Sequence, residues 1–107
     1  MIKYVALYRT PEDPADFDEH YFRTHVPLAN ATPGLVRTEL ARVRRTVTGD
    51  PALYVMAELY FQSYDAMKAA FKTPEWAASG QNLAAWGGLD LVSLHVAEIV
   101  DDDGKPA

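Results

Sequence analysis

Two segments that read as β-strands, residues 53–61 and 89–100, are apolar on both of their faces. Side chains alternate between the faces of a strand, so a sheet covered by helices on one side only should pair an apolar face with a polar one. The two faces of the first segment hold Val55, Ala57, Leu59 and Phe61, and then Tyr54, Met56, Glu58 and Tyr60. We therefore expect both faces of the sheet to meet protein.

The strand-like segments, helix caps and prolines in the rest of the chain predict a β-α-β-β-α-β order. Strand-like residues fill 2–9 and 35–47 as well as the two segments above, and helices are expected over 14–25, 63–71 and 74–82. Asp13, Ser63 and Thr73 stand at N-cap positions, and Pro27 should end or kink the first helix. This order predicts an α+β, ferredoxin-like fold: an antiparallel sheet with helices on one face. The alternative is two unrelated hairpins with loosely packed helices.

Helices of this length can cover only one face of such a sheet. Leaving the other face in water costs about 1.5–3 kcal/mol for each large apolar side chain. We therefore expect a homodimer in which an identical subunit, related by a two-fold axis, covers the second face. The alternative is an ordinary monomer with some exposed aromatic residues.

Composition excludes several classes of function. The chain has 107 residues, 10 Lys+Arg against 15 Asp+Glu, a net charge of −5 and no cysteine. An acidic chain makes nucleic acid an unlikely partner, and the missing cysteines exclude disulfides and thiolate chemistry. We expect one domain over residues 1–100, a disordered acidic tail over 101–107, no metal site and no membrane span. The opening MIKYVALY has no signal-peptide layout, so the expected location is cytoplasmic.

The first predicted helix carries the best candidate for chemistry. Tyr21 and His25 are four residues apart on the arc that should face the sheet, so their side chains share one space. Histidine titrates near neutral pH and tyrosine can orient it or donate a proton, which makes a proton-transfer pair. The alternative is that His25 only bonds a backbone carbonyl at the helix end.

Other side chains are candidates for walls or for internal pairing. His95 lies in the last strand and faces either the cavity or the subunit interface. Glu58 is expected to pair with an arginine of the second strand, Arg37, Arg42 or Arg44. Four aromatic residues could line a pocket for a hydrophobic ligand, with plain core packing as the alternative: Tyr8, Phe61, Trp76 and Trp86.

The segment from Tyr8 to Ala29 resembles the EthD family, which is named for ethyl tert-butyl ether degradation. The turn Pro33-Gly34-Leu35 and the stretch 54–63 resemble it too. The block His25-Val26-Pro27-Leu28, with a tyrosine four residues before the histidine, is the most specific part. The resemblance extends from residue 2 to about residue 99.

The resemblance implies a dimeric α/β barrel, in which two ferredoxin-like subunits place their sheets face to face. The wider superfamily includes cofactor-free monooxygenases, lactone isomerases, polyketide cyclases and heme-binding members, and ligands there sit between sheet and helices. In the lactone methylisomerase branch, the histidine that matches His25 is a candidate active-site residue.

These observations predict a protein that binds a small hydrophobic metabolite, aromatic or lactone-like, without a cofactor. His25 is expected to act as general acid or base with Tyr21 as its partner, in cofactor-free oxygenation or isomerisation. The expected ligand-binding residues are Tyr8, Phe61, Trp76, Trp86 and His95. The alternatives are a non-catalytic metabolite-binding accessory of an oxygenase system, and heme binding through His25 or His95.

Overall fold

The computed structural model describes residues 1–100, so the expected acidic tail lies outside the described residues. It contains ten elements in the predicted order: β1 (Ile2–Arg9), α1 (Pro14–His20), η1 (Tyr21–His25), α2 (Val26–Asn30), β2 (Arg37–Arg42), β3 (Leu53–Phe61), α3 (Tyr64–Ala70), α4 (Pro74–Ala85), η2 (Gly88–Leu91) and β4 (Val92–Glu98). The four strands form one antiparallel sheet in the order β2-β3-β1-β4. The α+β, ferredoxin-like prediction is confirmed.

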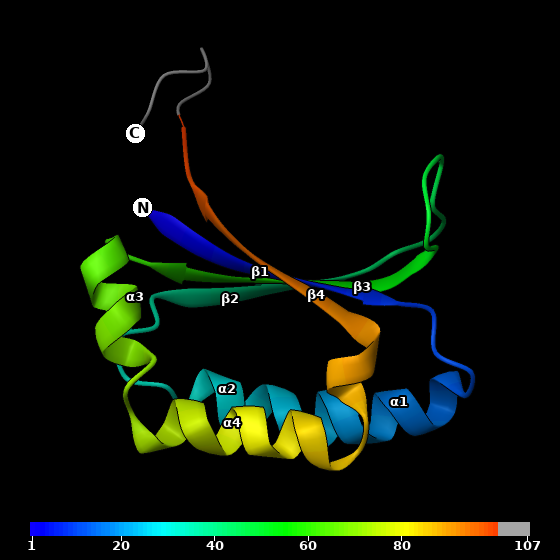
Figure 1. The fold of residues 1–107 in the computed structure, drawn as a ribbon, viewed down its shortest axis with the longest axis horizontal. Coiled ribbons are helices and arrows are strands. Elements are labelled where there is room, and N and C mark those ends of the chain that lie inside the picture. The colour runs from blue at the N-terminus through cyan, green and yellow to red at the C-terminus, as the bar shows by residue number, and fades with distance from the viewer. Residues whose placement is uncertain (101–107) are drawn as a thin grey trace.

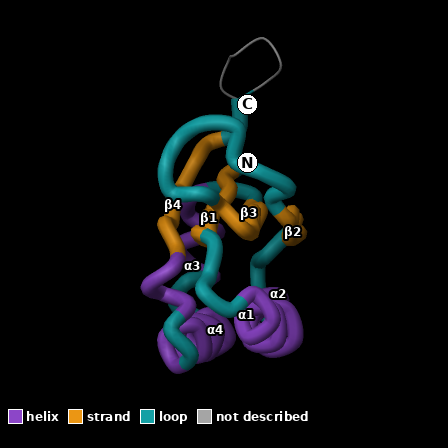
Figure 2. Tube along the Cα trace, turned by 90° about the vertical axis from the view of Figure 1, so that its right-hand side faces the viewer, coloured by secondary structure: helices purple, strands orange, loops and turns teal. Residues whose placement is uncertain are grey.

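The helices gather on one side of the sheet. In Figure 1 and Figure 2, α1, α2 and α4 lie side by side below the sheet. The largest fully buried side chains fill the space between the two layers: Tyr8, Phe17, Tyr21, Val55 and Phe61. No helix of the described residues 1–100 covers the other face, and none of them is both long and apolar enough to cross a bilayer.

Pro27 does not end the first helix, contrary to one reading of the sequence. A π-helical turn, η1, precedes the proline, and the N–H of Val26 bonds to the carbonyl of Tyr21 five residues back. Proline has no N–H to donate, and its ring presses on the carbonyl four residues before it in a regular α-helix. The wider turn accommodates this conflict, and α2 continues to Asn30. His25 therefore lies within a long helical segment rather than at its end.

The caps are confirmed, but two strands are shorter than predicted. Asp13, Ser63 and Thr73 each accept a backbone N–H at the start of their helices. The second strand covers residues 37–42 rather than 35–47, and the last begins at Val92 because the chain first makes the 3₁₀ turn η2. A Cβ on Gly88 would lie 2.5 Å from a Leu83 methyl, so this turn packs directly against α4.

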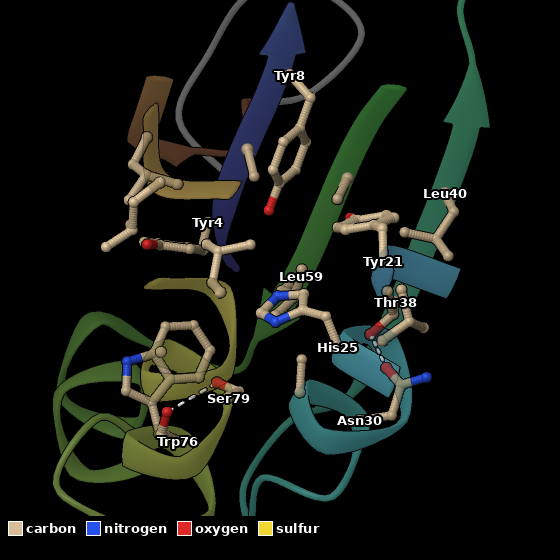
Figure 3. Close-up of a pocket in the computed structure, with 18 residues that line it drawn as sticks. Tyr4, Tyr8, Tyr21, His25, Asn30, Thr38, Leu40, Leu59, Trp76 and Ser79 are labelled. Atoms are coloured by element: carbon tan, nitrogen blue, oxygen red, sulfur yellow. Dashed lines mark hydrogen bonds between the residues drawn. The ribbon is translucent and has the colours of Figure 1, made fainter. Parts of the chain in front are cut away.

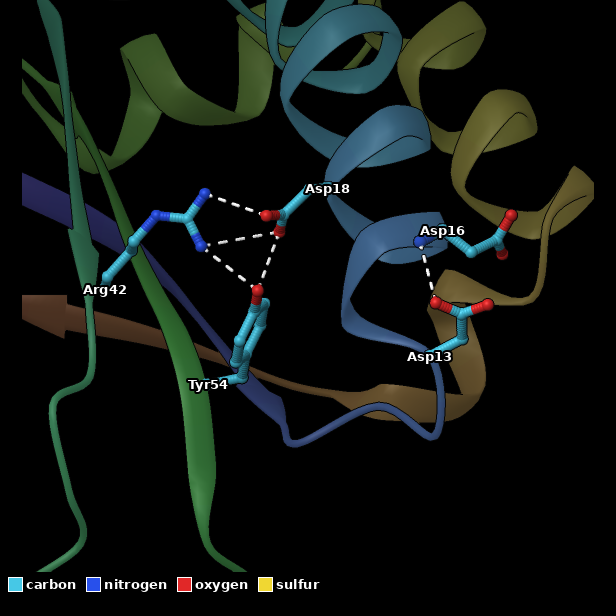
Figure 4. Close-up of polar contacts among 5 residues, drawn as sticks. All are labelled: Asp13, Asp16, Asp18, Arg42 and Tyr54. Atoms are coloured by element: carbon cyan, nitrogen blue, oxygen red, sulfur yellow. Dashed lines mark hydrogen bonds and ion pairs between the residues drawn. The ribbon is translucent and has the colours of Figure 1, made fainter.

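A β-bulge moves Tyr54 from its expected face. The register between β1 and β3 shifts at Tyr8/Arg9, which leaves Tyr54 as the extra residue, and bulges re-aim side chains in this way. Its hydroxyl donates to Asp18 of α1 at 2.9 Å, and Arg42 of β2 pairs with the same carboxylate at 3.0 Å (Figure 4). This cluster ties the β2 edge of the sheet to α1.

The face without helices carries apolar side chains together with two ion pairs among the described residues, Lys3–Glu58 and Arg37–Glu39. Val5, Leu7 and Met56 remain half-buried there in the single chain. Glu58 pairs with Lys3 at 2.7 Å, so the predicted arginine partner is wrong. Antiparallel pairing of β1 and β3 sets Val5 opposite Glu58, which places Lys3 one diagonal step from the carboxylate. The hydrogen bond from Lys3 lowers the pKa of Glu58, so both groups are charged near neutral pH.

Candidate functional site

A cavity of about 110 Å³ lies between the sheet and the helices. Its walls come from β1, β2 and β3 on one side and from η1, α2 and α4 on the other, with Leu89 and Leu94 at one edge (Figure 3). Among the described residues 1–100, no lysine, arginine, aspartate or glutamate lines it. An unpaired charge is costly to bury in such a place, so the cavity favours uncharged ligands.

His25 projects from η1 into this cavity, between α4 and the sheet (Figure 3). Burial lowers the pKa of His25 from its ordinary value of 6.5, while the backbone of Ser79 and the side chain of Asn82 raise it in part. The imidazole is therefore neutral at neutral pH, with one nitrogen free to accept a proton. Its Nδ1 atom is buried and has no hydrogen-bond partner.

Tyr21 meets His25 through its ring rather than through its hydroxyl. The two rings stack with centroids 5.5 Å apart and planes at 25°. A π turn closes over five residues, which brings positions four apart nearly into line. The sequence prediction correctly placed the two side chains together, but the contact is packing and not the expected hydrogen bond.

Tyr8 of β1 supplies a second phenol, whose hydroxyl points into the cavity (Figure 3). Its ring packs edge to face against Tyr21 with centroids 4.8 Å apart. Burial raises the pKa of both phenols well above the ordinary value of 10, and the neighbouring phenol adds to the effect on Tyr8. Both hydroxyls therefore stay protonated and can act as hydrogen-bond donors.

Trp76 forms another wall of the cavity, as predicted for it. Tyr4 packs edge to face against Trp76 with centroids 5.2 Å apart, and Phe71 stacks on the indole at 4.2 Å. Of the predicted ligand-binding residues, Tyr8 and Trp76 thus line the cavity.

The other three predicted ligand-binding residues lie elsewhere. Phe61 is fully buried in the core. Trp86, just after α4, packs against α1, with Phe17 at a ring-centroid distance of 5.5 Å and His20 stacked on the indole at 5.4 Å. His95 pairs in register with Val5 on the face without helices, where its Nε2 lies 3.1 Å from Ser93 Oγ. The sequence left the side of His95 open, because both faces of the last strand are apolar and parity does not tell which of them meets the helices.

Two polar groups in or beside the cavity were not among the site residues predicted from the sequence. Asn30 accepts a hydrogen bond from Thr38 at 2.7 Å in the cavity wall. Asn82 accepts one from the indole N–H of Trp86 at 3.2 Å, one helical turn away. The sequence predicts a helix that ends near Asn82, whereas α4 runs to Ala85 and sets Asn82 and Trp86 on one face.

The site offers little for a bound metal or a heme. Within residues 1–100, no group of three or more His, Asp or Glu side chains is arranged to hold a metal ion. The cavity is also smaller than the roughly 300–1,000 Å³ of usual ligand pockets, and a porphyrin does not fit a volume of about 110 Å³. A single ring is the size of ligand that the cavity accommodates.

Comparison with known proteins assigns the family. The EthD domain model matches residues 9–85, which is most of the chain. The chain belongs to the EthD family. An uncharacterized 11.0 kDa protein from the thcB-thcC intergenic region of Rhodococcus erythropolis is 39% identical over 85 residues, 79% of each chain. An EthD family protein of Bacillus halodurans is 37% identical, with a TM-score of 0.86 over 94% of this chain and 99% of that one.

More distant structures share the fold of this EthD chain. A dimeric ferredoxin-like protein of unknown function from Jannaschia sp. is 19% identical, with a TM-score of 0.66 over 92% of this chain and all of that one. SnoaB, a cofactor-independent oxygenase from Streptomyces nogalater, is 23% identical, with a TM-score of 0.55 over 90% and 87% of the two chains. At these identities the likeness establishes the ferredoxin-like fold only.

Proposed function

We propose that this EthD protein is a cofactor-free enzyme for a small uncharged metabolite, aromatic or lactone-like, in which His25 removes a proton from the ligand. The observation that carries the proposal is a neutral, half-buried imidazole inside an apolar cavity that no charged side chain lines among residues 1–100. A general base must be unprotonated before it can take a proton, and a histidine whose pKa is lowered by burial meets that condition at neutral pH.

The reaction begins with an O–H, or with a C–H beside a carbonyl group. His25 takes the proton and leaves a phenolate or enolate, whose oxygen accepts a hydrogen bond from a protonated phenol such as Tyr8. The anion can then take a proton at a different carbon, which completes an isomerisation. Its carbanion form can alternatively add to dioxygen, the oxidant: a C–O bond forms, the O–O double bond becomes single, and the peroxide anion takes the proton from His25 to give a hydroperoxide. The shared fold of the oxygenase SnoaB supports this branch.

We also propose that two copies of the chain pack through their helix-free faces. Val5, Leu7 and Met56 are apolar side chains of this face. Its charged groups are paired within the chain, Glu58 with Lys3 and Glu39 with Arg37. A second sheet can therefore cover the face without burying an unpaired charge. The dimeric ferredoxin-like protein of Jannaschia supports this assembly.

Binding of p-cresol, one neutral ring with one hydroxyl, tests the ligand site. Gly80 lines the cavity from α4, and a Cβ added there meets no atom within 4 Å. Phenylalanine at this position can therefore enter the cavity opening without disturbing the fold. We expect isothermal titration to show one p-cresol per wild-type chain, and Gly80→Phe to weaken binding about tenfold or more, ~1.4 kcal/mol.

Ala78→Phe is the matched control, since Ala78 is exposed on the same helix and does not line the cavity. It should bind p-cresol like the wild type. Equal binding by all three proteins would place the ligand outside this cavity and contradict the proposal.

A further inference from the structure

A row of small side chains gives the cavity its direction. The strand register sets Ala57 of β3 directly opposite Ala6 of β1, and both residues line the cavity. Residues two apart on a strand share a face, so the neighbours of Ala6 on this side are Tyr4 and Tyr8, whose rings flank the space (Figure 3). The alanines leave that space open. The cavity therefore runs across the strands from β2 to β4, a distance of about 14 Å for this sheet order.

At its β2 end the row is fastened to the helices. Leu40 ends the row here, opposite the alanine of β3. One neighbour of Leu40 on this face, Thr38, donates a hydrogen bond to Asn30 of α2 at 2.7 Å. The other neighbour, Arg42, pairs with Asp18 of α1 at 3.0 Å. These contacts hold β2 against the helix layer on both sides of Leu40.

At its β4 end the row has no such fastening. Leu94 ends the row here, opposite Ala6. The polar side-chain contact of β4 joins His95 to Ser93 on the helix-free face, and within residues 1–100 no side chain of β4 bonds to a helix. The β4 edge is therefore the end at which the cavity opens to solvent.

Apolar side chains continue outward from this opening. Leu89, Leu94 and Val96 are each 44–49% exposed, although Leu89 and Leu94 also line the cavity. Val96 lies two residues after Leu94 and shares its face of β4, and Glu98 ends the series two residues later. Leu89, Leu94 and Val96 together form the apolar strip. It begins inside the cavity and continues outside it, so a group attached to a bound ring reaches the strip directly.

We propose that the ligand carries an uncharged alkyl substituent, which leaves the cavity at the β4 edge and lies on the apolar strip. This inference rests on the proposed function of the same cavity and extends its ligand from one ring to a ring with a tail. A cavity of about 110 Å³ holds the ring, and the strip covers the carbon atoms that the cavity cannot hold. The carboxylate of Glu98 at the end of the strip disfavours an anionic tail. The chemical class is a neutral alkylphenol or an alkyl-substituted lactone, and Leu94 determines the specificity for the tail.

Isothermal titration with p-cresol and with 4-butylphenol tests this inference. The two phenols share a ring and a hydroxyl and differ by three methylene groups, so the ratio of their dissociation constants measures the contribution of the tail. Full burial of a methylene tightens binding about fourfold, and a strip that stays half exposed should give about twofold. We therefore expect the wild type to bind 4-butylphenol about eightfold more tightly than p-cresol. Leu94→Thr should lower this ratio to about two, because threonine suits a strand but presents less apolar surface.

Leu40→Thr is the matched control, since it makes the same substitution at the opposite end of the row, on the other edge strand. It should keep the ratio at about eight. A wild-type ratio near one overturns the inference, and this result needs no variant to fold. A ratio lowered by Leu40→Thr as much as by Leu94→Thr overturns it as well, because the tail would then not leave at the β4 edge. If p-cresol binds with a ratio near one, the proposed function still stands, whereas a chain that binds neither phenol contradicts both.

Discussion

Leu7→Arg is expected to convert the protein from a dimer to a monomer at micromolar concentration. Leu7 lies on the helix-free face in the inner strand β1, opposite Met56 on β3. A large apolar side chain contributes about 1.5–3 kcal/mol when buried, and a two-fold interface contains the residue twice. The loss of roughly 3–6 kcal/mol raises the dissociation constant by about two to four powers of ten. Sedimentation velocity over a concentration series measures the change.

Val47→Arg provides the control for the added charge. Val47 is 80% exposed, lies between β2 and β3, and belongs to neither face of the sheet. This variant should remain dimeric, and both variants should keep the wild-type circular dichroism spectrum. A wild-type chain that sediments as a monomer at micromolar concentration, or a dimeric Leu7→Arg, would contradict the assembly.

His25→Gln is expected to lose roughly 10²–10⁴-fold in the rate of a proton-transfer reaction. The isomerisation of α-angelica lactone is a suitable probe, because it is a small uncharged lactone. A base removes a proton from C3, and the resulting dienolate takes a proton at C5 to give the conjugated lactone. Proton NMR follows both species, and glutamine keeps the polarity of the site while it cannot act as the base.

The pH dependence of the same reaction follows from the direction of the His25 shift. Only the neutral imidazole accepts a proton, so the wild-type rate should rise with pH to a plateau, with the midpoint of the rise below 6.5, since burial lowers the pKa of His25. Tyr21→Phe should fold and retain most of the rate, because the Tyr21 ring, and not its hydroxyl, contacts His25. Equal rates for His25→Gln and the wild type, with p-cresol still bound, would remove His25 from the chemistry.

The local chemistry of the sequence was enough to predict the elements and their order. The caps at Asp13, Ser63 and Thr73 fix where three helices begin, and the alternation in 53–61 fixes a strand whose bounds the structure reproduces. Helical spacing alone also brought Tyr21 and His25 together. These features depend on neighbours within a few residues, which a single sequence contains.

Features that depend on packing between distant segments were not predictable in the same way. The π turn before Pro27 is adopted within the packed helix layer, and the bulge that re-aims Tyr54 arises from pairing between β1 and β3. The tight turn after α4 delays β4 to Val92. The side of His95 stayed open because both faces of this strand are apolar, and only the packing of the helices decides which face they cover. The hydrogen bond between Trp86 and Asn82 was not predictable, because Trp86 lies beyond the helix end expected from sequence.

A crystal structure of the wild-type protein with p-cresol tests the central claim, that the space between sheet and helices is the ligand site. The account predicts one ring per chain between β1 and α4, with its hydroxyl within hydrogen-bonding distance of His25. Density for the ring on the helix-free face or at the molecular surface, with the cavity beside His25 empty, would contradict it.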